Sequence, residues 1–136
     1  MIATMSDLSL HPIGTIRSPV TDRKIAPRNR DENAPEAWLE IVPEYHDALL
    51  GVKVQDQLIL LTWLHQARRE TLQVHLKRIP NAPLTGVFAT RSPDRPNPIG
   101  LHEVTVLEIA GNRLRVDALE CIDGTPILDI KPLLCP

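Results

Sequence analysis

Residues 101–119, LHEVTVLEIAGNRLRVDAL, consist of two largely apolar stretches on either side of Gly111 and Asn112. Glycine in the first of two turn positions is typical of a type II′ turn, so this segment predicts a β-hairpin. In its second arm, residues 113–119, apolar and polar side chains alternate, which predicts one buried and one exposed face.

Other short apolar stretches before and after this hairpin predict further strands. They are residues 8–16, 38–42, 57–64, 71–77, 86–90 and 126–131. Residues 57–64, QLILLTWL, are almost wholly apolar, and we expect them to be buried on both faces.

One segment, residues 43–51, predicts a helix, because it begins with proline and an acid and ends with glycine. Residues 18–37 contain three prolines among charged residues and are interpreted as a long irregular loop. Many short strands separated by turns favour a mainly β fold, a small antiparallel β-barrel with one short helix.

The composition excludes two large classes of nucleotide-binding protein. The 136 residues include 13 prolines and 6 glycines, and no two glycines lie closer than about eleven positions. Dinucleotide-binding and P-loop motifs both need glycines within a few residues of one another. With 43% hydrophobic residues, the chain is expected to form a single domain over residues 1–136, with no additional C-terminal domain.

The chain carries no signal for secretion, for a membrane or for a metal. No apolar run approaches the length of a membrane span, and the N-terminus lacks a secretory pattern. Cys121 and Cys135 are interpreted as free thiols of a cytoplasmic protein. The histidine and cysteine spacing does not match a zinc site, so no metal is expected.

Positive charge is concentrated in two segments, although the whole chain has a net charge of −2. Residues 17–30 contain five basic residues and one acid, and residues 68–95 contain six basic residues and two acids. The two segments together are candidates for binding an anionic partner. The alternative is that they are solvated faces paired with the acidic segment 31–60.

Residues 89–100, ATRSPDRPNPIG, are the most unusual part of the chain. Three prolines fix their own φ angles and restrict the residues before them, so this loop is expected to be rigid. A rigid loop holds Arg91, Arg95 and Asn97 in place before a ligand arrives. The alternative is a plain connector with solvated arginines.

The string TRSPDRPNPIGL at residues 90–101, followed by CIDGTPILDIKPL at residues 121–133, resembles the TsaA-like (TrmO) family. The similarity extends from about residue 13 to residue 133. It implies a homodimeric methyltransferase on a small antiparallel β-barrel, with S-adenosyl-L-methionine as methyl donor. Members methylate N6 of threonylcarbamoyladenosine, position 37 of tRNA next to the anticodon, so a tRNA bound through segments 17–30 and 68–95 is the implied partner.

The resemblance also implies a donor-binding site of four clusters. They are Pro27, Arg28 and Asn29; His65 and Gln66; Arg91 with Leu101; and Asp123, Gly124 and Thr125. Asn29 stands where the family usually has glutamine. Considered alone, each cluster has a simpler explanation, for example the end of a strand or a tight turn.

Methyl transfer to an amine depends mainly on alignment and on exclusion of water. The residues expected to carry it are Arg91, Arg95, Asn97 and Asp123, of which Arg95 and Asn97 would orient the acceptor. Three alternatives remain at this stage. They are a regulatory module that binds S-adenosylmethionine, a small-molecule methyltransferase on the same barrel, and a β-barrel interaction domain that binds no donor.

Overall fold

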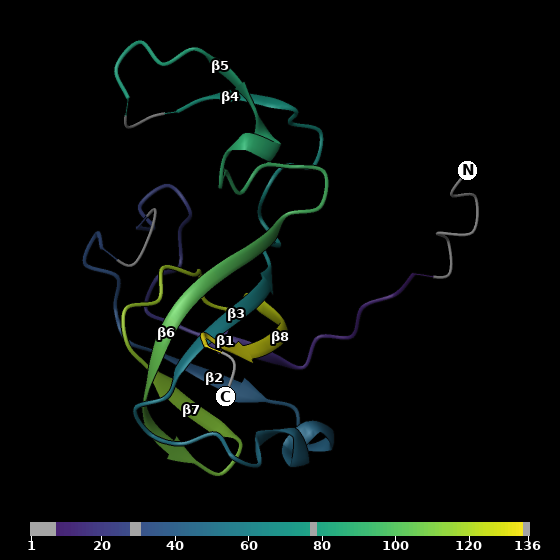
Figure 1. Cartoon of the computed structure of the whole chain (residues 1–136), viewed down its shortest axis with the longest axis vertical. Coiled ribbons are helices and arrows are strands. Elements are labelled where there is room, and N and C mark those ends of the chain that lie inside the picture. Colours follow the sequence, from purple (N-terminus) through teal and green to yellow (C-terminus); the bar gives the residue numbers. More distant parts are fainter. Residues whose placement is uncertain (1–7, 28–30, 77–78, 135–136) are drawn as a thin grey trace.

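Six of the strands form a closed antiparallel barrel. The computed structural model describes residues 8–27, 31–76 and 79–134. Its elements are, in chain order, β1 (Gly14–Arg17), β2 (Ala37–Ile41), the 3₁₀ helix η2 (Pro43–Leu49), β3 (Gln57–Trp63), β4 (Gln73–His75), β5 (Leu84–Gly86), the 3₁₀ helix η3 (Val87–Ala89), β6 (Ile99–Ala110), β7 (Arg113–Val116) and β8 (Pro126–Pro132). The barrel has the strand order β1-β2-β7-β6-β3-β8, and β1 pairs with β8 as well as β2, which closes the sheet (Figure 1). The predicted mainly β barrel is therefore confirmed.

The hairpin predicted around Gly111 is present as β6 and β7. The two strands pair up to Ala110 and Arg113, the residues that flank the turn. Gly111 has a φ of +63°, the sign that the first residue of a type II′ turn requires. In β7, Leu114 and Val116 are fully buried, as the alternation predicts.

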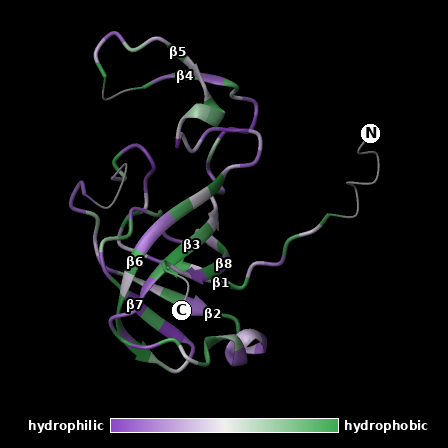
Figure 2. Cartoon of the chain, viewed as in Figure 1, coloured by the Kyte–Doolittle hydropathy of each residue, from purple (hydrophilic) through white to green (hydrophobic). Residues whose placement is uncertain are grey.

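Aliphatic side chains fill the barrel, and hydrophobic residues gather on its strands (Figure 2). In β3 the buried residues are Leu58, Leu60 and Thr62. The expectation that β3 is buried on both faces is wrong, because the residues between these three are partly exposed. Only the inner face of β3 contributes to the buried core of the barrel, through Leu58, Leu60 and Thr62.

The prediction of a strand at residues 86–90 is also wrong. β5 ends at Gly86, and the next three residues form η3. The carbonyl oxygens of Val87 and Thr90 accept hydrogen bonds from the Arg95 side chain instead of from a neighbouring strand. These carbonyls are thus bonded to a side chain from the loop that follows, and not to the neighbouring strand that the β-rich composition predicts.

Several other elements are shorter than expected or differ in type. The strand expected at residues 8–16 is confined to β1, and the one expected at 71–77 is confined to β4. The predicted helix exists as η2, a 3₁₀ helix that begins at Pro43. Residues 18–27 and 31–36 contain no strand or helix, as expected for the long loop. In the described part of the chain, no helix is long and apolar enough to cross a membrane.

β4 and β5 form a separate two-stranded sheet that projects from the barrel (Figure 1). We call the described residues between 71 and 90 the arm. The strand predicted at residues 71–77 shows half-buried alternation in β4, where Val74 is partly buried between the exposed Gln73 and His75. Leu72 departs from this pattern because it is exposed, and Leu84 and Phe88 of the arm are exposed as well. Among the described elements, β4 and β5 pair only with each other, so the barrel sheet does not continue into the arm.

Candidate functional site

The loop after β1 is hydrogen-bonded to the turn at Asp123 and Gly124, which belongs to the motif at residues 121–133. Ser18 N–H donates to Asp123 Oδ1 at 3.0 Å, and Asp123 N–H donates to the Val20 carbonyl at 2.7 Å. Gly124 N–H donates to the Ile16 carbonyl at 2.8 Å. Two segments 105 residues apart in sequence therefore lie side by side.

The turn itself is stabilised from within. Thr125 is buried, and its Oγ1 donates to the Ile122 carbonyl at 2.6 Å. Asp123 and Gly124 form the turn that the sequence indicates. Because Thr125 Oγ1 is engaged inside the protein, the part of this cluster nearest the surface is the Asp123–Gly124 turn.

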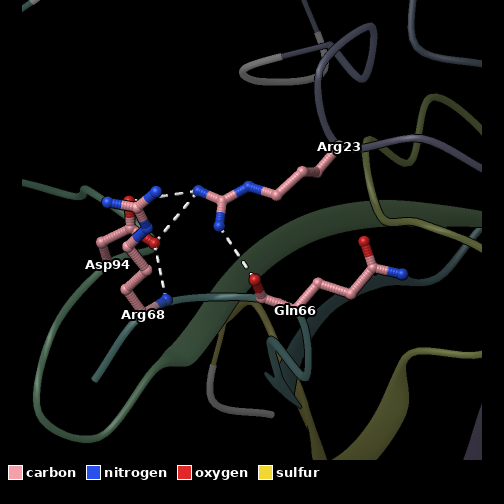
Figure 3. A network of polar contacts seen from close by, with 4 residues as sticks. All are labelled: Arg23, Gln66, Arg68 and Asp94. Atoms are coloured by element: carbon pink, nitrogen blue, oxygen red, sulfur yellow. Dashed lines mark hydrogen bonds and ion pairs between the residues drawn. The ribbon is translucent and has the colours of Figure 1, made fainter. Parts of the chain in front are cut away.

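Three segments meet at a network of polar contacts formed by Arg23, Gln66, Arg68 and Asp94 (Figure 3). Arg23 Nη2 lies 3.0 and 3.1 Å from the two carboxylate oxygens of Asp94, and Arg23 Nη1 donates to the Gln66 carbonyl at 2.9 Å. The backbone N–H of Arg68 donates to Asp94 Oδ1 at 2.8 Å. The network joins the long loop, the segment after β3 and the proline-rich loop.

We call residues 90–98 the proline loop, and Arg69 contacts it from outside. Arg69 Nε donates to the Pro96 carbonyl at 2.8 Å, and its Nη2 donates to Asn97 Oδ1 at 3.1 Å. The same guanidinium lies 5.1 Å from the centre of the Trp63 ring, within range of a cation–π contact. The Asn97 side chain is thus held through its oxygen, which leaves the amide N–H groups for another partner.

Arg95 contacts the proline loop from inside. Its Nη2 donates to the Thr90 carbonyl at 2.8 Å and also to the Val87 carbonyl. Its Nε is buried, and among the described residues it finds no hydrogen-bond partner. The structure therefore places the Arg95 guanidinium in the support of the loop and not on its outer surface.

The other predicted site residues with described positions are exposed at the end of the barrel where β3 ends and β6 begins. They are His65, Gln66, Arg91 and Leu101. His65 and Gln66 follow β3, and Arg91 lies in the proline loop, which leads into β6. Trp63 pairs with Ile99 where β3 and β6 meet, so the segment after β3 and the proline loop leave the barrel at the same end. Leu101 is 44% exposed on the outer face of β6.

Two predicted residues have no described position. Arg28 and Asn29 lie outside the described residues, while Pro27 is the last described residue before them. Within the described chain, the structure brings together the long loop, the segment after β3, the proline loop and the Asp123 turn.

The two basic segments also meet, although several of their charges are already paired. Arg23 of the first segment contacts Asp94 of the second, and Arg17 pairs with Glu40 of the acidic segment at 2.9 Å. The pairing of Arg17 with Glu40 agrees with the interpretation of paired, solvated faces. The binding of an anionic partner stays a prediction. Lys24 and Arg91 are exposed members of the two segments.

A buried polar cluster beneath the site was missed in the sequence. His102 contacts Thr62 Oγ1 through Nε2 at 2.8 Å and Glu120 Oε1 through Nδ1 at 2.6 Å. Cys121 Sγ lies 3.3 Å from His102 Nε2, and burial raises the pKa of this thiol well above its usual range. The alternation of β6 was the available signal, since it places Gly100, His102 and Val104 on one face.

Two further observations delimit the site. A cavity of about 930 Å³ lies near the start of β3, under η2, and its lining includes Tyr45, Leu49 and Leu58. The predicted cluster His65–Gln66 lies beyond the other end of β3, so this cavity is separate from the site. Among residues 8–27, 31–76 and 79–134, no group of three or more histidine, cysteine or acidic side chains is arranged to hold a metal ion.

Comparison with known proteins identifies the family. The family described as the tRNA-methyltransferase O N-terminal domain matches residues 15–135. The chain belongs to this TrmO family. The resemblance found in its two motifs is therefore confirmed.

Its relatives include proteins named for S-adenosyl-L-methionine binding and a protein named for tRNA methylation. A probable S-adenosyl-L-methionine-binding protein of Methanothermobacter thermautotrophicus is 42% identical over 132 residues, covering 94% of this chain and 93% of the relative. The tRNA (adenine(37)-N6)-methyltransferase of Escherichia coli K12 is 34% identical, covering 96% of this chain and 59% of the relative.

A solved structure supports the same fold. The crystal structure of TrmO from Pseudomonas aeruginosa is similar with a TM-score of 0.72 and 34% identity. The match covers 93% of this chain and 56% of the TrmO chain. The present chain therefore spans little more than half the length of that TrmO chain.

Proposed function

We propose that this TrmO-family chain is an S-adenosyl-L-methionine-dependent methyltransferase that modifies N6 of adenine 37 in tRNA, with threonylcarbamoyladenosine as the acceptor. The observation that carries the proposal is the meeting of four segments at one end of the barrel: the long loop, the segment after β3, the proline loop and the Asp123 turn. Relatives named for donor binding and for tRNA methylation support it.

The side chains at this end match the chemistry of the donor. S-adenosylmethionine combines a carboxylate, an ammonium group and an adenine ring. The exposed guanidinium of Arg91 suits a carboxylate, and the side-chain amide of Gln66 suits the edge of adenine. Leu101 offers an apolar surface on the outer face of β6.

We assign donor binding to the four clusters named in the sequence. They are Pro27, Arg28 and Asn29; His65 and Gln66; Arg91 with Leu101; and the turn Asp123, Gly124 and Thr125. The bound donor supplies an electrophilic methyl group on a positively charged sulfur. The task of the chain is then to align donor and acceptor and to exclude water.

The acceptor side is assigned to residues on and beside the proline loop. Asn97 is held through Oδ1 by Arg69, so its amide N–H groups are available to an acceptor base. Arg91 is exposed on the same loop. Arg95, which bonds the carbonyls of Val87 and Thr90, is assigned to support of the loop in place of acceptor contact.

We assign to Asp123 the stabilisation of the positive charge that develops on the nucleophilic nitrogen. The exocyclic nitrogen of adenine is a weak nucleophile, and an acceptor near its N–H stabilises positive charge as the new bond forms. Ser18 N–H holds the Asp123 carboxylate in a fixed position at the turn. A fixed carboxylate avoids the cost of reorganisation during the reaction.

Partners and location follow from this substrate. Lys24 is exposed next to Arg23, where the two basic segments meet, and such a group contacts phosphates and makes binding salt-dependent. We further propose a homodimer, supported by the exposed apolar side chains of the arm. A tRNA substrate would place the protein in the cytoplasm.

The test uses labelled donor and tRNA that lacks the modification. We expect the wild-type protein to transfer label, and Arg91→Ala and Asn97→Ala to lose transfer by at least about a hundredfold with the circular dichroism spectrum unchanged. Lys53→Ala, which removes an exposed positive charge near the start of β3, is the matched control and should retain activity.

The outcomes distinguish the alternatives. Donor binding without transfer to tRNA would favour a regulatory module, and transfer to a small molecule alone would favour a different acceptor. Near-normal tRNA methylation by both Arg91→Ala and Asn97→Ala would overturn the assignment of these residues.

A further inference from the structure

In the first half of the long loop, residues 21–27 depend on one side chain for their hydrogen bonds to other described segments. Among the described residues, the hydrogen bonds that join residues 21–27 to other segments are all made by the Arg23 side chain. The bonds of Lys24 and Ile25 are local, both to Asp22, and Ile25 is 78% exposed. Among the described residues, Arg23 is therefore the hydrogen-bonded anchor of this part of the loop.

The other half of the anchor is Asp94, at the centre of the proline loop. Asp94 accepts from Arg23 and from the backbone N–H of Arg68, and the next residue, Arg95, donates its N–H to the Arg68 carbonyl at 3.0 Å. The carboxylate therefore ties the proline loop to the segment after β3 as well as to the long loop (Figure 3). Three of the four segments of the proposed site meet at this one side chain.

The contacts of Arg23 with Asp94 are charge-assisted and partly shielded from water. The side chain of Asp94 is 23% exposed and that of Arg23 is 35% exposed. Charge-assisted hydrogen bonds between partly buried groups exceed neutral ones in strength. Arg23 also binds the carbonyl of Gln66, whose side chain extends away from Asp94 (Figure 3).

We propose that Arg23 and Asp94 form a latch that positions the donor-binding loop, so that Asp94 sets the affinity for the methyl donor without contacting it. The latch holds Arg23, four residues before Pro27, against the backbone of Gln66. It thereby holds the described part of the loop that leads to Pro27 beside the segment that carries His65 and Gln66. Asp94 is a positioning residue, and the inference rests on the proposed function of this end of the barrel.

The proposal also changes the role of Arg23. In the sequence, Arg23 belongs to a basic segment that could contact phosphate. In the structure its guanidinium is satisfied by Asp94 and the Gln66 carbonyl. We therefore expect substitution of Arg23 to alter donor binding more than the salt dependence of tRNA binding.

The test is a double-mutant cycle on the full chain with Arg23→Ala, Asp94→Ala and both together. Calorimetry with S-adenosylmethionine should give each single variant a Kd raised about tenfold, with the double variant close to either single one. At saturating donor, kcat on tRNA should stay within about threefold of wild type, since the loss lies in binding. Asp94→Asn, which keeps an acceptor oxygen, should lose less than Asp94→Ala.

The matched control is Glu70→Gln, which removes an exposed carboxylate near Arg68 and should leave the donor Kd unchanged. Equal Kd values in wild type and Asp94→Ala, or losses that simply multiply in the double variant, would overturn the latch.

Hydrogen exchange of the ligand-free protein separates this inference from the proposed function. Asp94→Ala should increase exchange of the amides between residues 21 and 26 relative to Glu70→Gln. Unchanged exchange there would also overturn the latch. Failure of the wild-type protein to bind the donor would overturn the proposed function, while the exchange result judges the latch by itself.

Discussion

Gly100 illustrates how closely single atoms are placed beneath the site. A Cβ at this position would lie 2.5 Å from Thr62 Oγ1, 2.6 Å from His102 Nε2 and 3.0 Å from a methyl group of Leu64. The strand pairing of β3 with β6 brings Gly100 directly opposite Thr62. The absence of a side chain here leaves room for the buried hydrogen bond between Thr62 and His102.

Gly100→Ala is therefore expected to destabilise the protein by about 1–3 kcal/mol, because the Thr62 and His102 side chains must move. Thermal unfolding should show a Tm lower by at least about 3 °C. Gly86→Ala is the matched control: Gly86 has a φ of −64° and open space around its Cβ position. An equal Tm for the two variants would contradict the packing argument.

Cys121 gives a prediction about pH. Burial keeps its thiol protonated in the folded protein, whereas the unfolded chain loses this proton near pH 9.0. The folded state then binds more protons, so stability is unaffected well below pH 9.0 and falls by up to about 1.4 kcal/mol per pH unit above it. Urea unfolding at pH 7 and pH 10 should show a steeper decline in wild type than in Cys121→Ser. An equal fall in the free energy of unfolding for both proteins would show that the Cys121 thiol does not cause the pH dependence.

At this scale, the sequence identifies motif residues but not which of them face a ligand. Arg95 and Asn97 are separated by one residue, yet Arg95 bonds carbonyls within the loop and Asn97 is exposed. Arg69, which holds Asn97, lies 28 positions away in sequence. Such pairing depends on tertiary geometry, which residue types and local spacing do not contain.

Among the elements, the proline loop is held from two sides by arginines that come from different places. Arg95 bonds the loop from within, and Arg69 bonds Pro96 and Asn97 while lying over Trp63. Proline limits the backbone conformations of the loop, and these bonds select one position relative to the barrel. The rigidity of the loop is thus a product of both local sequence and distant contacts.

Arg69→Ala should lower kcat/KM for tRNA methylation by about tenfold or more, because Asn97 loses the contact that orients it. Arg69→Lys, which can form only one of the two bonds, should retain part of the activity. Arg113→Ala removes a comparable cation–π contact, at 4.3 Å from Trp38 in another part of the barrel, and should have little effect on kcat/KM. Equal activity of the Arg69→Ala and Arg113→Ala variants would exclude this role.

The strands could be predicted from the sequence where their formation depends on the local pattern of apolar and polar residues. The alternation around Gly111 and the apolar residues 57–64 correspond to β6, β7 and β3, because hairpin pairing and inward-facing residues follow directly from them. Residues 86–90 were misinterpreted, because a side chain from the proline loop satisfies carbonyls that a strand would otherwise pair. The outer exposure of β3 also depends on barrel closure, which local hydrophobicity does not reveal.

For the whole molecule, the most informative surface is the arm. Phe88 is 87% exposed, and Leu72 and Leu84 are also exposed on this two-stranded projection. An isolated two-stranded sheet is marginally stable in water, so a covering partner would both bury these side chains and stabilise the arm. η3, which carries Phe88, lies just before Arg91, so such a partner would lie beside the proposed site.

Phe88→Asp should therefore weaken the proposed homodimer, because a carboxylate cannot be buried in an apolar interface without a partner charge. Light scattering after size-exclusion chromatography should give the wild-type protein twice the chain mass of 15.2 kDa and the variant a mass shifted towards 15.2 kDa. Leu50→Asp is the matched control, because Leu50 is 93% exposed next to η2, away from the arm, and its mass should remain that of the wild type. A monomeric wild-type protein would refute the dimer, and an unchanged dimer in Phe88→Asp would place the interface elsewhere than the arm.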